Sequence, residues 1–205
     1  MLKDWPITLV TLTIWAYWGT VILLVLYKRV RYGQKSGVIP RARWEKRLWW
    51  GIVAVWLAWN TLPFLAGFLS RGPFALPIEA TEPGVVASLR WAAASVGVLC
   101  YLATLYCWLL MGRSWSMAIV PGQKTDLVTT GLFGVVRHPI YSLGILLMVC
   151  TAIVVATLPM LVAAVAYIAL LNYKARKEEE YLTSCHGEAY RGYCQRVGRF
   201  LPRFR

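Results

Sequence analysis

A short polar stretch at the start of an apolar segment carries the residues best suited to chemistry. Arg137, His138 and Tyr141 flank Pro139, a residue favoured in the first turn of a helix because it lacks an N–H that would go unpaired there. The free N–H groups of such a helix start, with Arg137 and His138, are suited to bind a carboxylate or a phosphate. From the residues alone, it is equally plausible that Arg137 extends to lipid headgroups and that Tyr141 joins an interfacial aromatic belt.

A second cluster of ionisable residues begins at Lys174 and includes Arg176 and three consecutive acids, Glu178 to Glu180. A carboxylate near a membrane can bind ribose hydroxyls or a positively charged ligand. The alternative is a solvated helix face, on which Lys174–Glu178 and Arg176–Glu180 form i,i+4 pairs worth about 0.2–0.5 kcal/mol each. The spacing alone slightly favours the solvated face.

The elements that must position these clusters are membrane helices. Hydrophobic residues make up 59% and charged residues 15% of the 205 residues, whereas soluble domains have about 25% charged residues. The net charge of +13, in a chain with several apolar stretches, favours basic loops on anionic lipid over nucleic-acid binding. Five cysteines without a CxxC pair and only two histidines do not indicate a metal site. We therefore predict an all-α integral membrane protein.

Apolar stretches of about 20 residues, the length that crosses a bilayer, occur at residues 7–27, 48–69 and 85–111. A fourth apolar block, residues 140–173, is too long for one span. Pro159 near its middle predicts a break into two helices of about 17 residues each. We therefore expect five transmembrane helices, the last two forming a helical hairpin whose flanking polar segments share one membrane face.

Two regions follow from this pattern. Residues 1–111 hold three transmembrane helices and a basic loop, and residues 112–205 hold a cofactor loop, the hairpin and a helical C-terminal tail that Gly187 interrupts. The basic loop, residues 28–47, contains eight Lys and Arg, whereas residues 71–84 contain one arginine and two glutamates. By the positive-inside rule the basic loop and both polar clusters are cytoplasmic, and the N-terminus lies outside.

Five motifs, in this order, resemble the isoprenylcysteine carboxyl methyltransferase family, including its bacterial and archaeal members. They are Gly112-Arg-Ser-Trp-Ser116, Leu127-Val-Thr-Thr-Gly131, Arg137-His-Pro-Ile-Tyr141, Glu178-Glu-x-x-Leu182 and Gly187-Glu-x-Tyr190. The resemblance covers residues 112–202. It implies methyl transfer from S-adenosylmethionine (SAM) to a lipid-linked or small hydrophobic acceptor, expected to be a carboxylate, at the membrane–cytosol interface. A prokaryotic member would lie in the inner membrane.

In that family the loop before the His-Pro motif and the charged tail close over SAM. By position, the resemblance implies that the cofactor is bound by Thr125, Asp126, Leu127, Val128, Phe133, Arg137, His138, Pro139, Ile140, Tyr141 and Glu178. Lys174 falls where the eukaryotic members place an arginine that holds the substrate carboxylate, and Arg176 is the alternative. The resemblance thus marks Lys174, Arg176 and Glu178 as catalytic candidates, and the transfer requires no metal.

Two other classes of function remain open. A reductase related to the sterol reductases would bind NADPH at a similar tail, although such enzymes are usually much longer. A non-enzymatic transporter or assembly protein would need polar residues near the bilayer midplane, for which Asn60 and Thr104 are almost the only candidates. Oxygen, sulfur and nitrogen acceptors are all compatible with the methyltransferase pattern.

Overall fold

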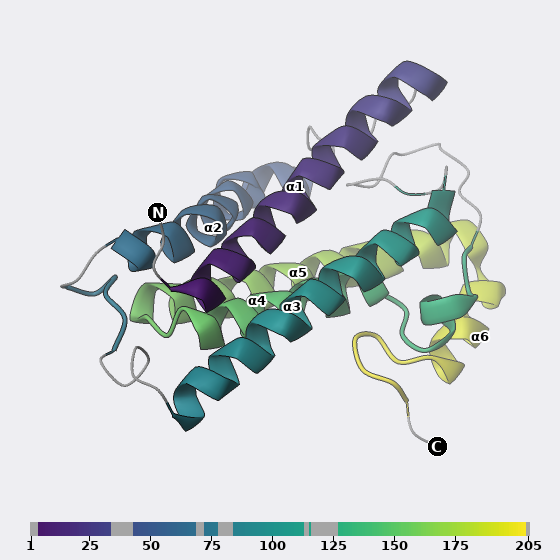
Figure 1. Ribbon diagram of the computed structural model, residues 1–205. Coiled ribbons are helices and arrows are strands. Elements are labelled where there is room, and N and C mark those ends of the chain that lie inside the picture. The colour runs from purple at the N-terminus through teal and green to yellow at the C-terminus, as the bar shows by residue number, and fades with distance from the viewer. Residues whose placement is uncertain are drawn as a thin grey trace.

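The computed structural model describes residues 4–33, 43–68, 72–77, 84–112, 115 and 127–203, which form a bundle of long helices with a short helix at one end (Figure 1). The helices are α1 (Trp5–Tyr32), α2 (Arg43–Phe68), α3 (Val85–Met111), α4 (Pro139–Val154), α5 (Leu158–His186) and α6 (Glu188–Arg196). A 3-10 turn, η3 (Gly131–Gly134), precedes α4. Within these ranges no strand occurs, and an isolated parallel bridge joins Val136 to Gly198.

Four of the helices, α1, α2, α3 and α5, are long and apolar enough to cross a bilayer. The prediction of an all-α membrane protein is therefore confirmed for the part of the chain that is described. Helix α4 has 16 residues, which gives it a length of about 24 Å at helical rise. It is shorter than an ordinary span, so the fifth transmembrane helix stays a prediction.

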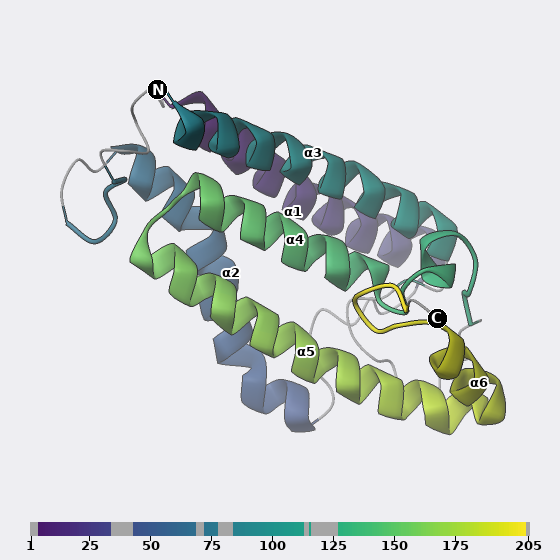
Figure 2. The ribbon, with the colours of Figure 1, turned by 90° about the horizontal axis from the view of Figure 1, so that it is seen from below.

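Helices α4 and α5 lie antiparallel and form a hairpin (Figure 2). Helix α4 ends at Val154, and α5 begins at Leu158 with Pro159 in its first turn, so the chain breaks where the sequence predicted. Helix α5 continues past Tyr173, the end of the apolar block, and through the charged tail to His186. Gly187, with a φ of 54°, separates α5 from α6, in a conformation that glycine adopts at low cost.

Small residues let α4 pack closely between α3 and α5. A Cβ added to Gly97 of α3 would lie 3.1 Å from Cδ1 of Leu147 in α4. On the other side of α4, a Cβ at Gly144 would lie 2.8 Å from the hydroxyl oxygen of Tyr167 in α5. Because protein interiors are close-packed, neither position has room for a side chain without displacement of its neighbour.

An ion pair joins the helices at the end of the bundle opposite α6 (Figure 1). We call this end the far end. Asp4 accepts a hydrogen bond from the N–H of Ile7 at 3.0 Å and so caps α1. The same carboxylate lies 2.7 Å from Nη2 of Arg90 in α3, whose side chain is 4% exposed. Nε of Arg90 donates to the carbonyl of Val154 at 3.0 Å. This buried arginine therefore joins the ends of α1, α3 and α4.

Candidate active site

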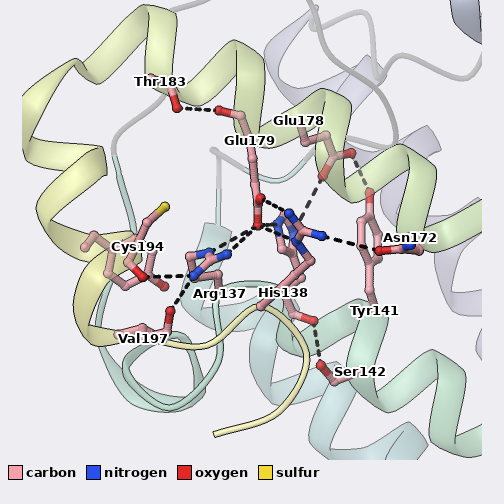
Figure 3. Close-up of polar contacts among 12 residues, drawn as sticks. Arg137, His138, Tyr141, Ser142, Asn172, Glu178, Glu179, Thr183, Cys194 and Val197 are labelled. Atoms are coloured by element: carbon pink, nitrogen blue, oxygen red, sulfur yellow. Dashed lines mark hydrogen bonds and ion pairs between the residues drawn. The ribbon is translucent and has the colours of Figure 1, made fainter. Parts of the chain in front are cut away.

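The hairpin brings the two polar clusters of the sequence together at the site end, by which we mean the end of the bundle that carries α6 (Figure 3). Arg137 and His138 lead into α4, and Tyr141 lies in its first turn. Glu178 projects toward them from α5 (Figure 3), and its Oε2 lies 3.8 Å from Nδ1 of His138. The proximity that the hairpin predicted is therefore present.

Glu179, rather than Glu178, is the centre of the ion-pair network. Arg137 donates to its Oε1 through Nε at 3.1 Å and Nη2 at 2.9 Å. Arg199 donates to the same carboxylate through Nε at 3.0 Å and Nη2 at 2.6 Å. The Nε2 atom of His138 lies 3.2 Å from Oε1. The side chain of Arg137 is 12% exposed and that of Glu179 is 14% exposed, so Arg137 is held inside the protein and does not extend to lipid headgroups.

Glu178 faces a different set of groups, on the side of α5 that Lys174 shares. Its Oε1 accepts a hydrogen bond from the Tyr141 hydroxyl, and its side chain remains 21% exposed. The Tyr141 ring is stacked on the His138 ring with the centroids 5.4 Å apart. The Lys174 ammonium lies 5.6 Å from the Tyr141 ring centroid, within the range of a cation–π contact. A carboxylate, an aromatic ring and an ammonium are thus adjacent.

Arg176 and Glu180 lie on another face of α5. Arg176 is exposed and lines a surface cavity together with Arg199. Glu180 pairs with Lys177 at 2.7 Å in an i,i+3 arrangement, and its side chain is 63% exposed. Glu180 therefore lies on a solvated helix face, as one interpretation of the sequence predicted. Glu178 and Glu179 do not.

The remaining residues predicted to contact the cofactor lie before α4 or in its first turn. Thr125 and Asp126 are outside the described residues. Val128 is partly buried. Pro139 is buried at the first position of α4, as its residue type predicts. Ile140 is partly buried and packs against the main hydrophobic core.

Leu127 and Phe133 pack toward α6. Leu127 lies against the buried cluster that Tyr190 and Tyr193 form. The carbonyl of Phe133 accepts a hydrogen bond from the Tyr193 hydroxyl. Burial raises the pKa of Tyr193 to about 12, so the phenol keeps the proton that it donates. These contacts hold the 3-10 turn against α6.

Sequence reasoning missed the part of the site that lies near the C-terminus. The N–H of Arg137 donates to the carbonyl of Gly198 at 2.8 Å, and the N–H of His138 donates to the carbonyl of Arg199 at 3.1 Å. Both N–H groups lie before the first turn of α4, so this pairing leaves the N–H groups of the helix start itself unaffected. The β-bridge between Val136 and Gly198 is a long-range pairing that no local pattern signals.

A second correction concerns Lys28, which the sequence placed in the exposed basic loop. Residues 28–32 are instead the last part of α1, and Lys28 is only 4% exposed. Its ammonium donates to the carbonyl of Trp115 and lies 5.3 Å from the centroid of that ring. Trp115 is itself buried and packs edge-on against Trp108. Lys28 therefore ties α1 to Trp115.

Part of the chain is similar to a known family. Residues 93–184 match the isoprenylcysteine carboxyl methyltransferase family, which confirms the family resemblance over the first four motifs. The chain is also 28% identical over 94 residues to the nickel-cobalt-cadmium resistance protein NccN of Alcaligenes xylosoxydans xylosoxydans, a match over 45% of this chain and 44% of that protein. The match thus spans less than half of that relative. In the described part of the chain, no three His, Cys, Asp or Glu side chains are grouped to hold a metal ion.

Proposed function

We propose that the protein is a SAM-dependent methyltransferase acting at the membrane–cytosol interface, because residues 93–184 match the isoprenylcysteine carboxyl methyltransferase family. One observation carries the proposal. Two clusters within the family match meet at one end of an apolar bundle, where Glu178 contacts Tyr141 and lies beside His138. The positive-inside rule supports a cytoplasmic position for this end, which is the side on which SAM is made.

The side chains around Glu178 fit the polar groups of SAM, which has an ammonium and ribose hydroxyls that donate hydrogen bonds. Glu178 is a partly exposed acceptor, and Tyr141 holds one of its oxygens in place. The Tyr141 ring already lies near one cation, Lys174, and the same ring surface suits a sulfonium. When bound, SAM supplies a methyl group that its sulfonium makes electrophilic.

Lys174 is the residue that we propose to orient the acceptor. It is one helical turn from Glu178 and therefore on the same face of α5, next to the Tyr141 ring. An ammonium there can bind a carboxylate, which is ionised at neutral pH and needs no general base. Arg176 is a weaker candidate, because it is exposed on a face of α5 that carries Glu180.

The acceptor is proposed to be lipid-linked or small and hydrophobic, because the site lies where the apolar part of α5 gives way to its charged part. The apolar portion of such an acceptor can stay in the bilayer while its carboxylate reaches Lys174. Holding the two reactants in line can lower the barrier by several kcal/mol. Exclusion of water from the carboxylate raises its reactivity further.

Thermal unfolding of the purified protein in detergent tests the cofactor. S-adenosylhomocysteine is expected to raise the unfolding temperature, because a ligand that binds the folded state stabilises it, and NADPH is expected to leave it unchanged. Stabilisation by NADPH and not by S-adenosylhomocysteine would favour the reductase class. If neither ligand changes the unfolding temperature, the methyltransferase proposal is refuted.

Transfer of a labelled methyl group tests the acceptor class. The purified protein is incubated with radiolabelled SAM and either a total membrane lipid extract or a prenylcysteine analogue. A base-labile labelled product is expected, since a methyl ester hydrolyses in base. A base-stable product would show that the acceptor is not a carboxylate and would point to another group, such as sulfur or nitrogen.

A further inference from the structure

Arg199 lies beyond the matched range, residues 93–184, yet it contacts the centre of the site. We propose that Arg199 is a positioning residue that holds Glu179 in the orientation in which Glu179 fixes the ring of His138. Arg199, in the C-terminal segment, thereby determines which ring nitrogen of His138 faces Glu178. The inference rests on the proposed function only for its effect on SAM binding.

The contact between Arg199 and Glu179 has the geometry of a specific pair. The Nε and Nη2 atoms of Arg199 reach different oxygens of the carboxylate, at 3.0 Å and 2.6 Å, which is the two-pronged arrangement that arginine favours. Its Nη1 lies 3.4 Å from Oδ1 of Asn172. Hydrogen bonding to Glu179 raises the pKa of Arg199, and the hydrogen bonds from His138, Arg199 and Arg137 hold the pKa of Glu179 well below its ordinary value despite its burial, so both groups are charged at neutral pH.

The backbone around Arg199 is fixed to the same residue that its side chain helps to orient. The carbonyl of Arg199 accepts from the N–H of His138 at 3.1 Å, and the Phe200 ring lies 6.0 Å from the His138 ring. Just before Arg199, a Cβ added to Gly198 would lie 2.0 Å from the carbonyl oxygen of Leu201. The segment therefore follows a tight path that places the guanidinium against Glu179.

The consequence for His138 follows from what each group can donate. A carboxylate only accepts hydrogen bonds, so Nε2 of His138, 3.2 Å from Glu179, carries a proton. In a neutral imidazole the other nitrogen, Nδ1, is then an acceptor, and it lies 3.8 Å from Oε2 of Glu178. When the ring is neutral, His138 and Glu178 present two adjacent acceptors, which suit an ammonium or a hydroxyl donor on one ligand.

Nitrogen NMR of the imidazole rings tests this directly, because the chain has only two histidines, His138 and His186. Protein labelled with 15N-histidine is studied in detergent without ligand, and His186→Gln assigns the signals. His138 is expected to carry a proton on Nε2 in the wild type, and Arg199→Gln is expected to shift the Nε2 signal because Glu179 then loses one of its two arginines. Arg203→Gln is the matched control, because Arg203 bonds to the carbonyl of Gln195 instead.

Calorimetry with S-adenosylhomocysteine supplies the second readout. Arg199→Gln is expected to weaken binding about tenfold, the effect of losing about 1.4 kcal/mol, and Arg199→Lys, which keeps the charge without the fork, to weaken it less. If Arg199→Gln fails to fold, the same comparisons are made with Arg199→Lys against the wild type and Arg203→Gln.

The outcomes separate this inference from the proposed function. A wild-type His138 without a proton on Nε2 would overturn the inference, as would an unchanged His138 spectrum in both Arg199 variants. If the wild type does not bind S-adenosylhomocysteine, the proposed function fails, while the tautomer measurement still decides the role of Arg199.

Discussion

The hydroxyl of Tyr141 donates a hydrogen bond to Oε1 of Glu178, although 37 positions separate the two residues. They meet because the chain reverses between Val154 and Leu158, which returns the charged part of α5 to the start of α4. The bond singles out Glu178 among three consecutive acids and fixes one of its oxygens. The face of α5 that carries Glu178 is therefore packed against the start of α4 and is only partly exposed.

Removal of the Tyr141 hydroxyl tests whether this bond prepares Glu178 for a ligand. Tyr141→Phe keeps the ring that stacks on His138 but frees Glu178 to move. We expect affinity for S-adenosylhomocysteine to fall by about fivefold to tenfold, since a hydrogen bond to a charged group contributes about 1.5 kcal/mol or less when its partner can rebind water. Calorimetry measures this, with Tyr101→Phe as the control because the Tyr101 hydroxyl contacts Thr20 away from the site. Equal affinities of the two variants would show that the bond is not needed.

Gly144→Ala tests the contact that sets the spacing of the hairpin. The added methyl would meet the Tyr167 hydroxyl at 2.8 Å, and the Tyr167 ring cannot easily yield because it packs against Trp59 with the centroids 4.9 Å apart. We expect a loss of about 1–3 kcal/mol in stability, seen as a lower unfolding temperature in detergent. Gly51→Ala is the control, because that position in α2 has open space and alanine is the better helix former. A hairpin that tolerates both changes equally would refute this packing.

Arg90 is expected to matter for stability and not for the site. Arg90→Gln leaves Asp4 without its charge partner at the far end, and breaking such a pair costs about 3 kcal/mol. The folded fraction should still bind S-adenosylhomocysteine with wild-type affinity, because the change lies at the opposite end of α4 from His138. Unfolding curves and calorimetry together check this. Wild-type stability, or weakened binding by the folded protein, would contradict the assignment.

Labelling of single cysteines tests the predicted orientation. Cys185 is exposed at the site end, and Ser88 is exposed near the start of α3 at the far end. Two variants are compared with a maleimide that does not cross membranes. The first carries Ser88→Cys and lacks Cys185 and Cys194, and it should be labelled in intact cells. The second keeps Cys185 and lacks Cys194, and it should be labelled only after permeabilisation. The opposite pattern would place the site outside and separate it from SAM.

Much of the fold was predictable because membrane helices follow from length and hydropathy. Pro159 marked the turn of the hairpin, and Gly187 marked the end of α5. The shared location of the two polar clusters followed from that turn alone. The sequence did not show that the tail continues α5 as one unbroken helix, because a helix can pass from lipid into water without any break in its backbone pattern.

The division of roles within the site was not predictable from the sequence. Glu178 and Glu179 are neighbours in the chain, and consecutive residues point about 100° apart on a helix, so the rotation of α5 decides which partner each meets. Glu179 finds its arginines on two separate segments, at Arg137 and Arg199. Lys28 likewise looked like one of several loop cations until the packing of α1 buried it.

Binding of S-adenosylhomocysteine to the purified protein, measured by calorimetry with Glu178→Gln and Glu188→Gln, tests the central claim most directly. Glu188 is the matched control because it is an exposed glutamate that pairs with Arg191 in α6. The wild type and Glu188→Gln should bind equally, and Glu178→Gln should bind about tenfold more weakly or worse, since it loses a charge-assisted acceptor. An affinity of Glu178→Gln equal to that of the wild type, or no binding by any of the three proteins, would contradict a SAM site at Glu178.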